Sequence, residues 1–209
     1  MKQWIQLGLL LATLFVCQAA EAFTANINPG TRSVYLRVGD GAYTGLANSG
    51  GTPGNLATVN LVSVSVAATA IGNGVDQPMT SSATNSRSFY DNYEFCNLPG
   101  EVYIGGFFRR PGTTGASTAV LSVTSPPNLV DADGDTIPFS EISWLSTGNG
   151  DGAAVQPVPA GTFTGGAQTL SNFPVNTWRE SCHSFRYENT TIRASGTYTG
   201  RVTYTLAVP

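Results

Sequence analysis

The residues best suited to chemistry in this chain are its only histidine, His183, and the serines near it, Ser181 and Ser184. A hydrolytic triad needs a nucleophile, a base and an acid that orients the base, and His183 is the sole candidate base. Neither serine lies in a Gly-x-Ser-x-Gly turn. Adjacent side chains on a strand point to opposite faces, so Ser184 and His183 would not converge. The sequence therefore predicts no enzyme and no catalytic residue.

Carboxylates suggest two other kinds of site. A glycosidase needs two facing carboxyl groups, but the glutamates are scattered and nominate no pair. The run Asp131–Asp135 resembles a calcium loop, yet Thr136 and Ile142 stand where a helix-loop-helix site requires glycine and glutamate. A turn between two strands explains Asp133-Gly134 equally well. Calcium binding by this loop stays open, and we predict no metal site and no cofactor.

The first 22 residues predict a secretory signal peptide. Lys2 supplies a positive charge, an apolar run covers residues 7–16, and Ala20-Glu21-Ala22 places small residues at the two positions that a signal peptidase reads. We therefore expect a secreted protein, which passes through the periplasm and ends outside the cell.

Export determines how the cysteines are interpreted. Cys17 is removed with the leader, and the remaining two, Cys96 and Cys182, predict one disulfide in an oxidising compartment. Such a bridge closes a long loop and stabilises the fold by about 4 to 5 kcal/mol in a chain-entropy estimate. A metal site built on both cysteines and His183 lacks a fourth ligand.

The composition excludes several classes of function. The chain has a net charge of -3, and its only lysine lies in the leader, which argues against a nucleic-acid surface. No second apolar run approaches the roughly 18 residues of a membrane span, so we expect no span in the mature chain. Abundant Gly, Thr, Ser and Asn with few charges is typical of exported β-proteins.

Period-two alternation and frequent turn residues predict an all-β, immunoglobulin-like antiparallel sandwich of about seven to nine strands. An arm or first strand covers residues 23–38, in which Val34, Leu36 and Val38 share one face, and the sandwich covers residues 39–209. The apolar parity changes between Leu61 and Val62, which predicts one bent strand over residues 56–66. Helix signals are confined to the leader.

The segment 88–110 holds the densest aromatic stretch, together with several arginines. Aromatic and arginine enrichment is typical of recognition surfaces. It is equally typical of a sandwich core with arginines at the strand ends, and we favour the core.

The last fourteen residues carry the clearest pattern in the chain. From Tyr198 onward apolar and polar side chains alternate, which predicts a half-buried strand up to Val208. Gly196 is fourteenth from the end, and apolar residues stand at the second, fourth, sixth and eighth places from the end, namely Val208, Leu206, Tyr204 and Val202.

This arrangement resembles the C-terminal signature of subunits assembled by the chaperone-usher pathway of bacterial pili. The resemblance implies a fimbrial subunit, which can also expose an adhesive surface. Its implied partners are a periplasmic chaperone, an outer-membrane usher and neighbouring subunits. It implies that the final strand (Gly196, Tyr198, Val202, Tyr204, Leu206, Val208) takes part in assembly and that Val34, Leu36 and Val38 belong to a donor strand. Val208 stands where the family usually has tyrosine.

Two alternatives remain open on the sequence. The closing strand also fits a self-complete secreted module that binds a carbohydrate or a surface. The strand through Val34, Leu36 and Val38 can pair within its own chain or with a neighbour, because both arrangements need the same period-two face.

Overall fold

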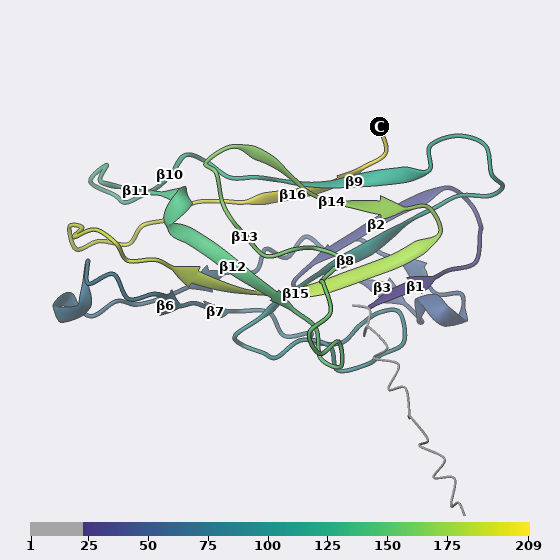
Figure 1. Cartoon of the computed structure of the whole chain (residues 1–209), viewed down its shortest axis with the longest axis horizontal. Coiled ribbons are helices and arrows are strands. Elements are labelled where there is room, and N and C mark those ends of the chain that lie inside the picture. Colours follow the sequence, from purple (N-terminus) through teal and green to yellow (C-terminus); the bar gives the residue numbers. More distant parts are fainter. Residues whose placement is uncertain (1–22) are drawn as a thin grey trace, which may run out of the picture.

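The computed structural model describes residues 23–209, so the predicted signal peptide at residues 1–22 lies outside the described part of the chain. Residues 23–209 form an all-β protein, as the sequence predicts (Figure 1). Their helical content is three short 3-10 turns, η1 (Ala47–Ser49), η2 (Ala68–Ala70) and η3 (Phe139–Glu141). None of the described helices is long and apolar enough to cross a membrane.

Seven strands form the main antiparallel sheet. Its central path runs β13 (Gly161–Thr162), β12 (Ile142–Thr147), β15 (Thr177–Tyr187), β8 (Val102–Arg109) and β2 (Ser33–Val38). Two short strands, β1 (Thr24–Asn26) and β6 (Gln77–Pro78), pair with the two ends of β15. The eleven-residue β15 is therefore the strand that holds most of this sheet together.

A three-stranded sheet lies over one face of the main sheet, in the order β14 (Ala167–Pro174), β9 (Thr118–Thr124) and β16 (Thr203–Ala207) (Figure 1). One hydrophobic cluster joins Ile104 and Phe108 of β8 to Leu121 of β9 and Phe173 of β14, all 0% exposed. A neighbouring cluster joins Val123 of β9 to Trp144 and Phe185 of the main sheet. The core thus fills the space between the two sheets.

The remaining strands are short paired segments at the margins. They form the ladders β3 (Tyr43–Thr44) with β4 (Thr52–Pro53), β5 (Val62–Ser63) with β7 (Thr80–Ser81), and β10 (Asn128–Val130) with β11 (Thr136–Pro138). The described chain therefore has sixteen strands, more than the seven to nine expected. These marginal segments pair over only two or three residues at a time, which raises the number of strands.

Strand β8 is buried on both faces, because the second sheet covers one face and a layer of loops covers the other. On the loop side, Phe107 packs with Tyr35 of β2 and Trp178 of β15. Gly106 allows the close approach of β2, since a Cβ at this position would lie 1.9 Å from the carbonyl oxygen of Tyr35. The aromatic stretch supplies core residues, so the core interpretation is confirmed for Phe95, Tyr103, Phe107 and Phe108, each at most 1% exposed.

The expected bent strand over residues 56–66 exists only in part. Val62 and Ser63 pair with β7, whereas residues 54–61 belong to no strand. The parity change separates two environments: Val62, Val64 and Val66 pack against the core, while Val59 and Leu61 are 65% and 64% exposed.

Candidate strand-acceptor groove

The last strand of the chain is an edge strand. Strand β16 pairs with β9 along one edge, and no strand of residues 23–209 pairs with its other edge. It is shorter than the predicted strand from Tyr198 to Val208, because Thr199 bridges to Val130 of β10 instead of β9. The chain changes partner near Gly200, where a Cβ would lie 2.6 Å from a ring carbon of Phe139.

The predicted alternation of burial is nevertheless present beyond the regular strand. The apolar residues of one parity are half-buried and pack against the core, whereas the intervening residues are exposed. The half-buried set is Tyr198, Val202, Tyr204, Leu206 and Val208. Gly196 is exposed and precedes this set, close to Asp131 of the β10–β11 hairpin.

Strand β2 is the second free edge. It pairs with β8 over six residues, and no described strand pairs with its outer edge. The residues predicted for a donor strand, Val34, Leu36 and Val38, therefore lie in this chain's own main sheet. Their side chains face the space between the sheets, yet Val34 is 39% exposed and the other two are only half-buried.

The two free edges flank a groove. A cavity of about 200 Å³ is lined by Leu36 and Val38 of β2, by Tyr204 of β16 and by loop residues that include Ala42 and Leu56. Core-facing side chains line both of its walls and remain partly open to solvent. The equivalent positions on the central strand β9, Leu121 and Val123, are 0% exposed. Cα atoms of β2 and β16 approach to within 8 Å, so the space between these two edges is narrower than the roughly 10 Å that a strand paired on both sides would need. The cavity therefore lies beside the free edges, and Tyr204 is its one lining residue from β16.

Hydrogen bonds to Asp40 hold the loop at one rim of the groove. The Asp40 carboxylate accepts bonds from the Asn60 side-chain amide and from the backbone N–H groups of Thr84 and Asn85, each at 2.9 Å. Burial alone would raise the pKa of Asp40, but these bonds together lower it. The carboxylate is therefore ionised at neutral pH and ties the start of the loop to two later segments.

The other face of β2 is anchored by a buried arginine. Arg37 is 1% exposed and donates to the carbonyl oxygens of Gly39, at 2.7 Å, and of Asn85 and Arg87. Its guanidinium carbon lies 4.3 Å from the centre of the Phe89 ring and 4.0 Å from that of Tyr103. These contacts fix β2 within its own chain, so it forms a wall of the groove.

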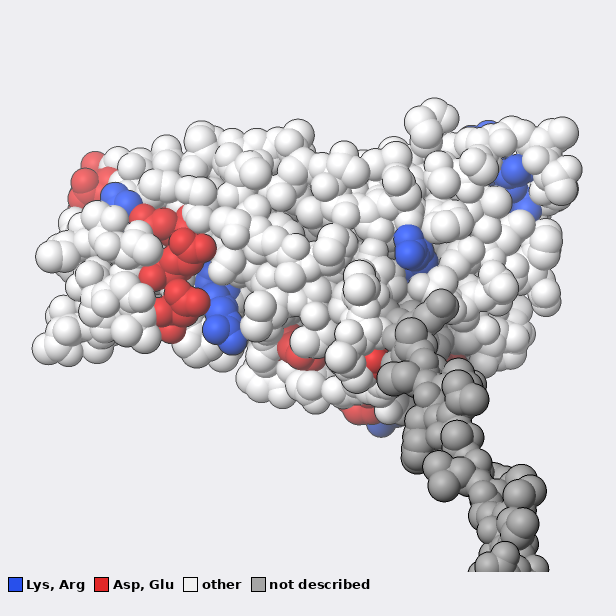
Figure 2. All heavy atoms as spheres, in the orientation of Figure 1, with Lys and Arg blue, Asp and Glu red and all other residues white. Residues whose placement is uncertain are grey.

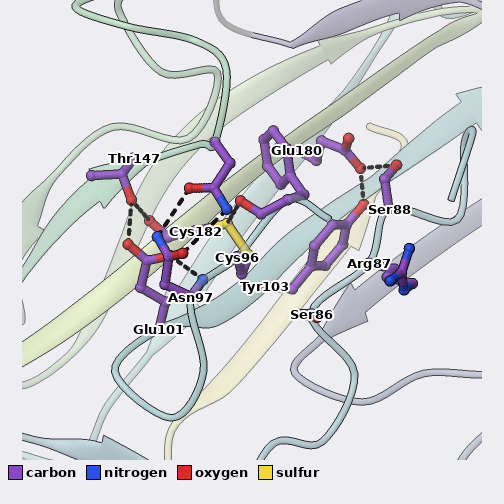
Figure 3. The surroundings of a disulfide bond; sticks show 12 residues. Ser86, Arg87, Ser88, Cys96, Asn97, Glu101, Tyr103, Thr147, Glu180 and Cys182 are labelled. Carbon is purple, nitrogen blue, oxygen red and sulfur yellow. Dashed lines mark hydrogen bonds between the residues drawn. A yellow bond between two sulfur atoms is a disulfide. The ribbon is translucent and has the colours of Figure 1, made fainter. Parts of the chain in front are cut away.

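A buried carboxylate lies behind this arginine. Glu180 is 0% exposed, and its Oε2 accepts hydrogen bonds from Ser88 and Tyr103 (Figure 3) and also from the Trp178 indole N–H. Burial raises the pKa of Glu180 to about 7, although the three donors act in the opposite direction. Sequence reasoning missed this network, because Glu180 stands alone in the sequence and its partners are far away along the chain.

The predicted disulfide is present. Cys96 and Cys182 are bonded, with Cα atoms 5.5 Å apart, and both are at most 2% exposed. Figure 3 shows polar side chains above the bridge: Glu101 accepts from the Thr147 hydroxyl at 2.7 Å and from the Asn97 backbone N–H at 2.7 Å. The bridge fastens the loop before β8 to the middle of β15.

His183 is a packed core residue. It is 0% exposed, its ring stacks on Trp144, and its Nε2 lies 3.3 Å from the carbonyl oxygen of Val158. Burial lowers the pKa of His183 to about 4. Ser181 accepts a hydrogen bond from the Val158 N–H at 3.0 Å. None of the described residues contacts Nδ1 of His183 by a hydrogen bond, so no orienting acid is in place.

The aspartates of the β10–β11 turn do not converge. Oδ1 of Asp131 accepts the backbone N–H groups of Asp133 and Asp135, at 3.1 and 2.8 Å, which closes the turn. Within residues 23–209, the one group of three potential metal ligands close together consists of the bonded cysteines and Glu101. Asp131 therefore has a structural role in the hairpin.

No family model matches the chain, and neither a curated protein nor a solved structure matches it significantly. The resemblance to chaperone-usher subunits thus depends on the C-terminal residues, and the functional argument depends on the groove beside them.

Proposed function

We propose that this protein is an exported structural subunit of a fimbria, completed by a strand added along the free edge of β16. The observation that carries the proposal is the pair of free edges whose core-facing side chains remain partly exposed around one groove. An inserted strand would pair with unpaired backbone groups and bury apolar surface at the same time, as in β-strand addition. The completed fold would be an immunoglobulin-like sandwich.

The donor that we propose is the segment Phe23–Asn28 of a neighbouring copy. Phe23, Ala25 and Ile27 alternate with polar residues, which is the pattern that a strand facing a core requires. In the single chain this segment pairs with β15 over three residues only, whereas β2 pairs with β8 over six. Releasing the arm at Pro29-Gly30 therefore costs fewer backbone hydrogen bonds than releasing β2.

The proposed partners follow from the same groove. An open edge beside exposed apolar side chains favours aggregation, so a periplasmic chaperone would cover the groove before assembly and an outer-membrane usher would direct the exchange. The mature protein would then reside in an extracellular fimbrium, with no enzymatic activity. The alternative is a self-complete module in which the arm stays on its own β15.

The test compares the mature chain, residues 23–209, with a chain that lacks residues 23–28. Strand exchange predicts that the mature chain forms oligomers that persist in cold detergent and dissociate on heating, because many hydrogen bonds must break together. The shortened chain should remain folded, by circular dichroism, and form no such oligomers. A full-length chain that stays a soluble monomer and never forms detergent-resistant ladders would leave the self-complete module as the explanation.

A further inference from the structure

Four arginines gather at the end of the molecule where the arm begins. Ser33 pairs with Arg109, which places Arg32 beside the end of β8. Arg110 lies at the same end, since its backbone N–H donates to the Asn176 side chain in the turn before β15. We call this the basic end, and it consists of Arg32, Arg109, Arg110 and Arg179.

The charges of the basic end lack partners. None of its four arginines forms an ion pair with a residue in the range 23–209. The Nε atoms of Arg109, Arg110 and Arg179 are buried without a hydrogen-bond partner, and burial lowers the pKa of Arg179. The Arg110 guanidinium donates to carbonyl oxygens of the loop 112–114, and Arg179 donates to that of Asn172. Arg32 is exposed and is therefore the group of this end that an incoming carboxylate can reach most readily.

Carboxylates gather at the opposite end of the molecule (Figure 2). The β10–β11 hairpin, the start of β12 and the end of β15 meet there, because the Glu188 N–H donates to the carbonyl oxygen of Glu141 and Arg193 reaches both Glu141 and Thr136. We call this the acidic end, and it consists of Asp76, Asp131, Asp133, Asp135, Glu141 and Glu188.

The acidic end keeps an excess of negative charge. Three arginines lie there: Arg201, which follows the Thr199–Val130 bridge, and Arg186 and Arg193, which are already paired with Asp76 and Glu141. Asp133 and Asp135 are exposed at the tip of the hairpin and form no ion pair with a described residue. Opposite ends of one molecule thus carry opposite, uncompensated charges, which suits head-to-tail contact between copies.

We propose that the basic end of one subunit docks on the acidic end of the next, an interface that rests on the strand exchange proposed above. The geometry links the two contacts, because the arm leaves the subunit at its basic end, beside Arg32. Strand β2 starts at the basic end and runs toward the acidic end, and β16 runs in the opposite direction, starting after the Thr199–Val130 bridge. Docking therefore brings the arm to β16 of the acceptor in the antiparallel direction.

The test reverses charges that are fully exposed, so that folding is spared. Arg32→Glu alone, or Asp133→Arg with Asp135→Arg, should slow formation of detergent-resistant oligomers about tenfold at low salt. The triple variant should restore the rate to within about twofold of the wild type, because each interface regains opposite charges. Added salt should reduce these differences, since the Debye length is about 8 Å at physiological ionic strength. Val155→Glu, at an 89% exposed position in the loop between β12 and β13, adds a negative charge without breaking an ion pair; it is the control and should leave the rate unchanged.

The outcomes separate the two proposals. Two results would overturn the docking interface and leave strand exchange standing. In one, ladders form at the same rate in every variant. In the other, the triple variant assembles no faster than the variants that reverse the charge at one end only. A wild-type chain that forms no ladder at all would overturn strand exchange and the interface with it.

Discussion

Leu121 and Leu206 face each other across the β9–β16 ladder, and only Leu121 is fully buried. Both side chains contact the same hydrophobic cluster. The difference arises from position: β9 has a neighbour on each side, whereas β16 has none on its outer edge. The exposed flank of Leu206 therefore indicates where an additional strand would pack.

Leu206→Asp should abolish the detergent-resistant oligomers while leaving a folded monomer. The aspartate would have to lose its hydration when a strand closes the groove, whereas in the lone chain it can reach water. We expect the free energy of unfolding of the monomer to fall by about 1–2 kcal/mol. Chemical denaturation and gel ladders measure the two effects. Thr205→Asp, which points outward, is the control, and equal ladders from both variants would contradict the account.

Replacing both cysteines with serine should lower the free energy of unfolding by about 4 kcal/mol, because the bridge closes a loop with a sequence separation of 86 residues. Urea unfolding of the oxidised wild type and of the double variant measures the difference. Since both sulfurs are buried, the folded wild type should also resist mild reductants. A loss below about 1 kcal/mol would show that the bridge contributes little to the fold.

Glu180 should make the protein less stable as the pH rises. Its folded pKa of about 7 lies above the ordinary value of 4.5, so the stabilisation is complete below pH 4.5 and is lost as the pH rises through 7. The shift corresponds to roughly 3 kcal/mol. Glu180→Gln keeps an acceptor for Ser88, Tyr103 and Trp178 but does not titrate. The free energy of unfolding of the wild type should fall relative to that of the variant as the pH rises from 4.5 to 7. A difference between the two free energies that stays constant over this range would refute the assignment.

His183 should have the opposite effect in acid. Burial lowers its folded pKa to about 4 from 6.5, so stability is complete above pH 6.5 and falls as the pH drops through 4. His183→Phe retains an aromatic ring beside Trp144 and removes the titration. Relative to this variant, the wild type should lose roughly 3 kcal/mol over that interval. If plots of the free energy of unfolding against pH are parallel for the two proteins between pH 7 and pH 4, the burial of a neutral imidazole is contradicted.

The sequence predicted the features that depend on local pattern. The all-β class, the disulfide and the inward parity of Tyr204, Leu206 and Val208 follow from alternation and from the number of cysteines. It did not predict which strands pair, because β2 and β16 have the same period-two pattern whether their outer edges are paired or free. The groove is a property of strand order, and the polar network around Glu180 is a property of contacts between distant segments. Neither leaves a local signal.

The most direct test of strand exchange locates the arm in a mixed polymer. One population would carry Thr205→Cys, and a second would carry a single cysteine at an outward-facing position of the arm: Thr24→Cys, Asn26→Cys or Asn28→Cys. The account predicts that, after mixing and oxidation, at least one of these positions gives a cross-link between two copies, identified by mass spectrometry. A chain that carries both Asn26→Cys and Thr177→Cys tests the competing arrangement, in which the arm stays on its own β15, because these two positions are register partners within the single chain. Two results together would contradict strand exchange. The Asn26→Cys and Thr177→Cys pair would cross-link within one chain in quantitative yield under assembly conditions, and no arm position would form a link to Thr205→Cys.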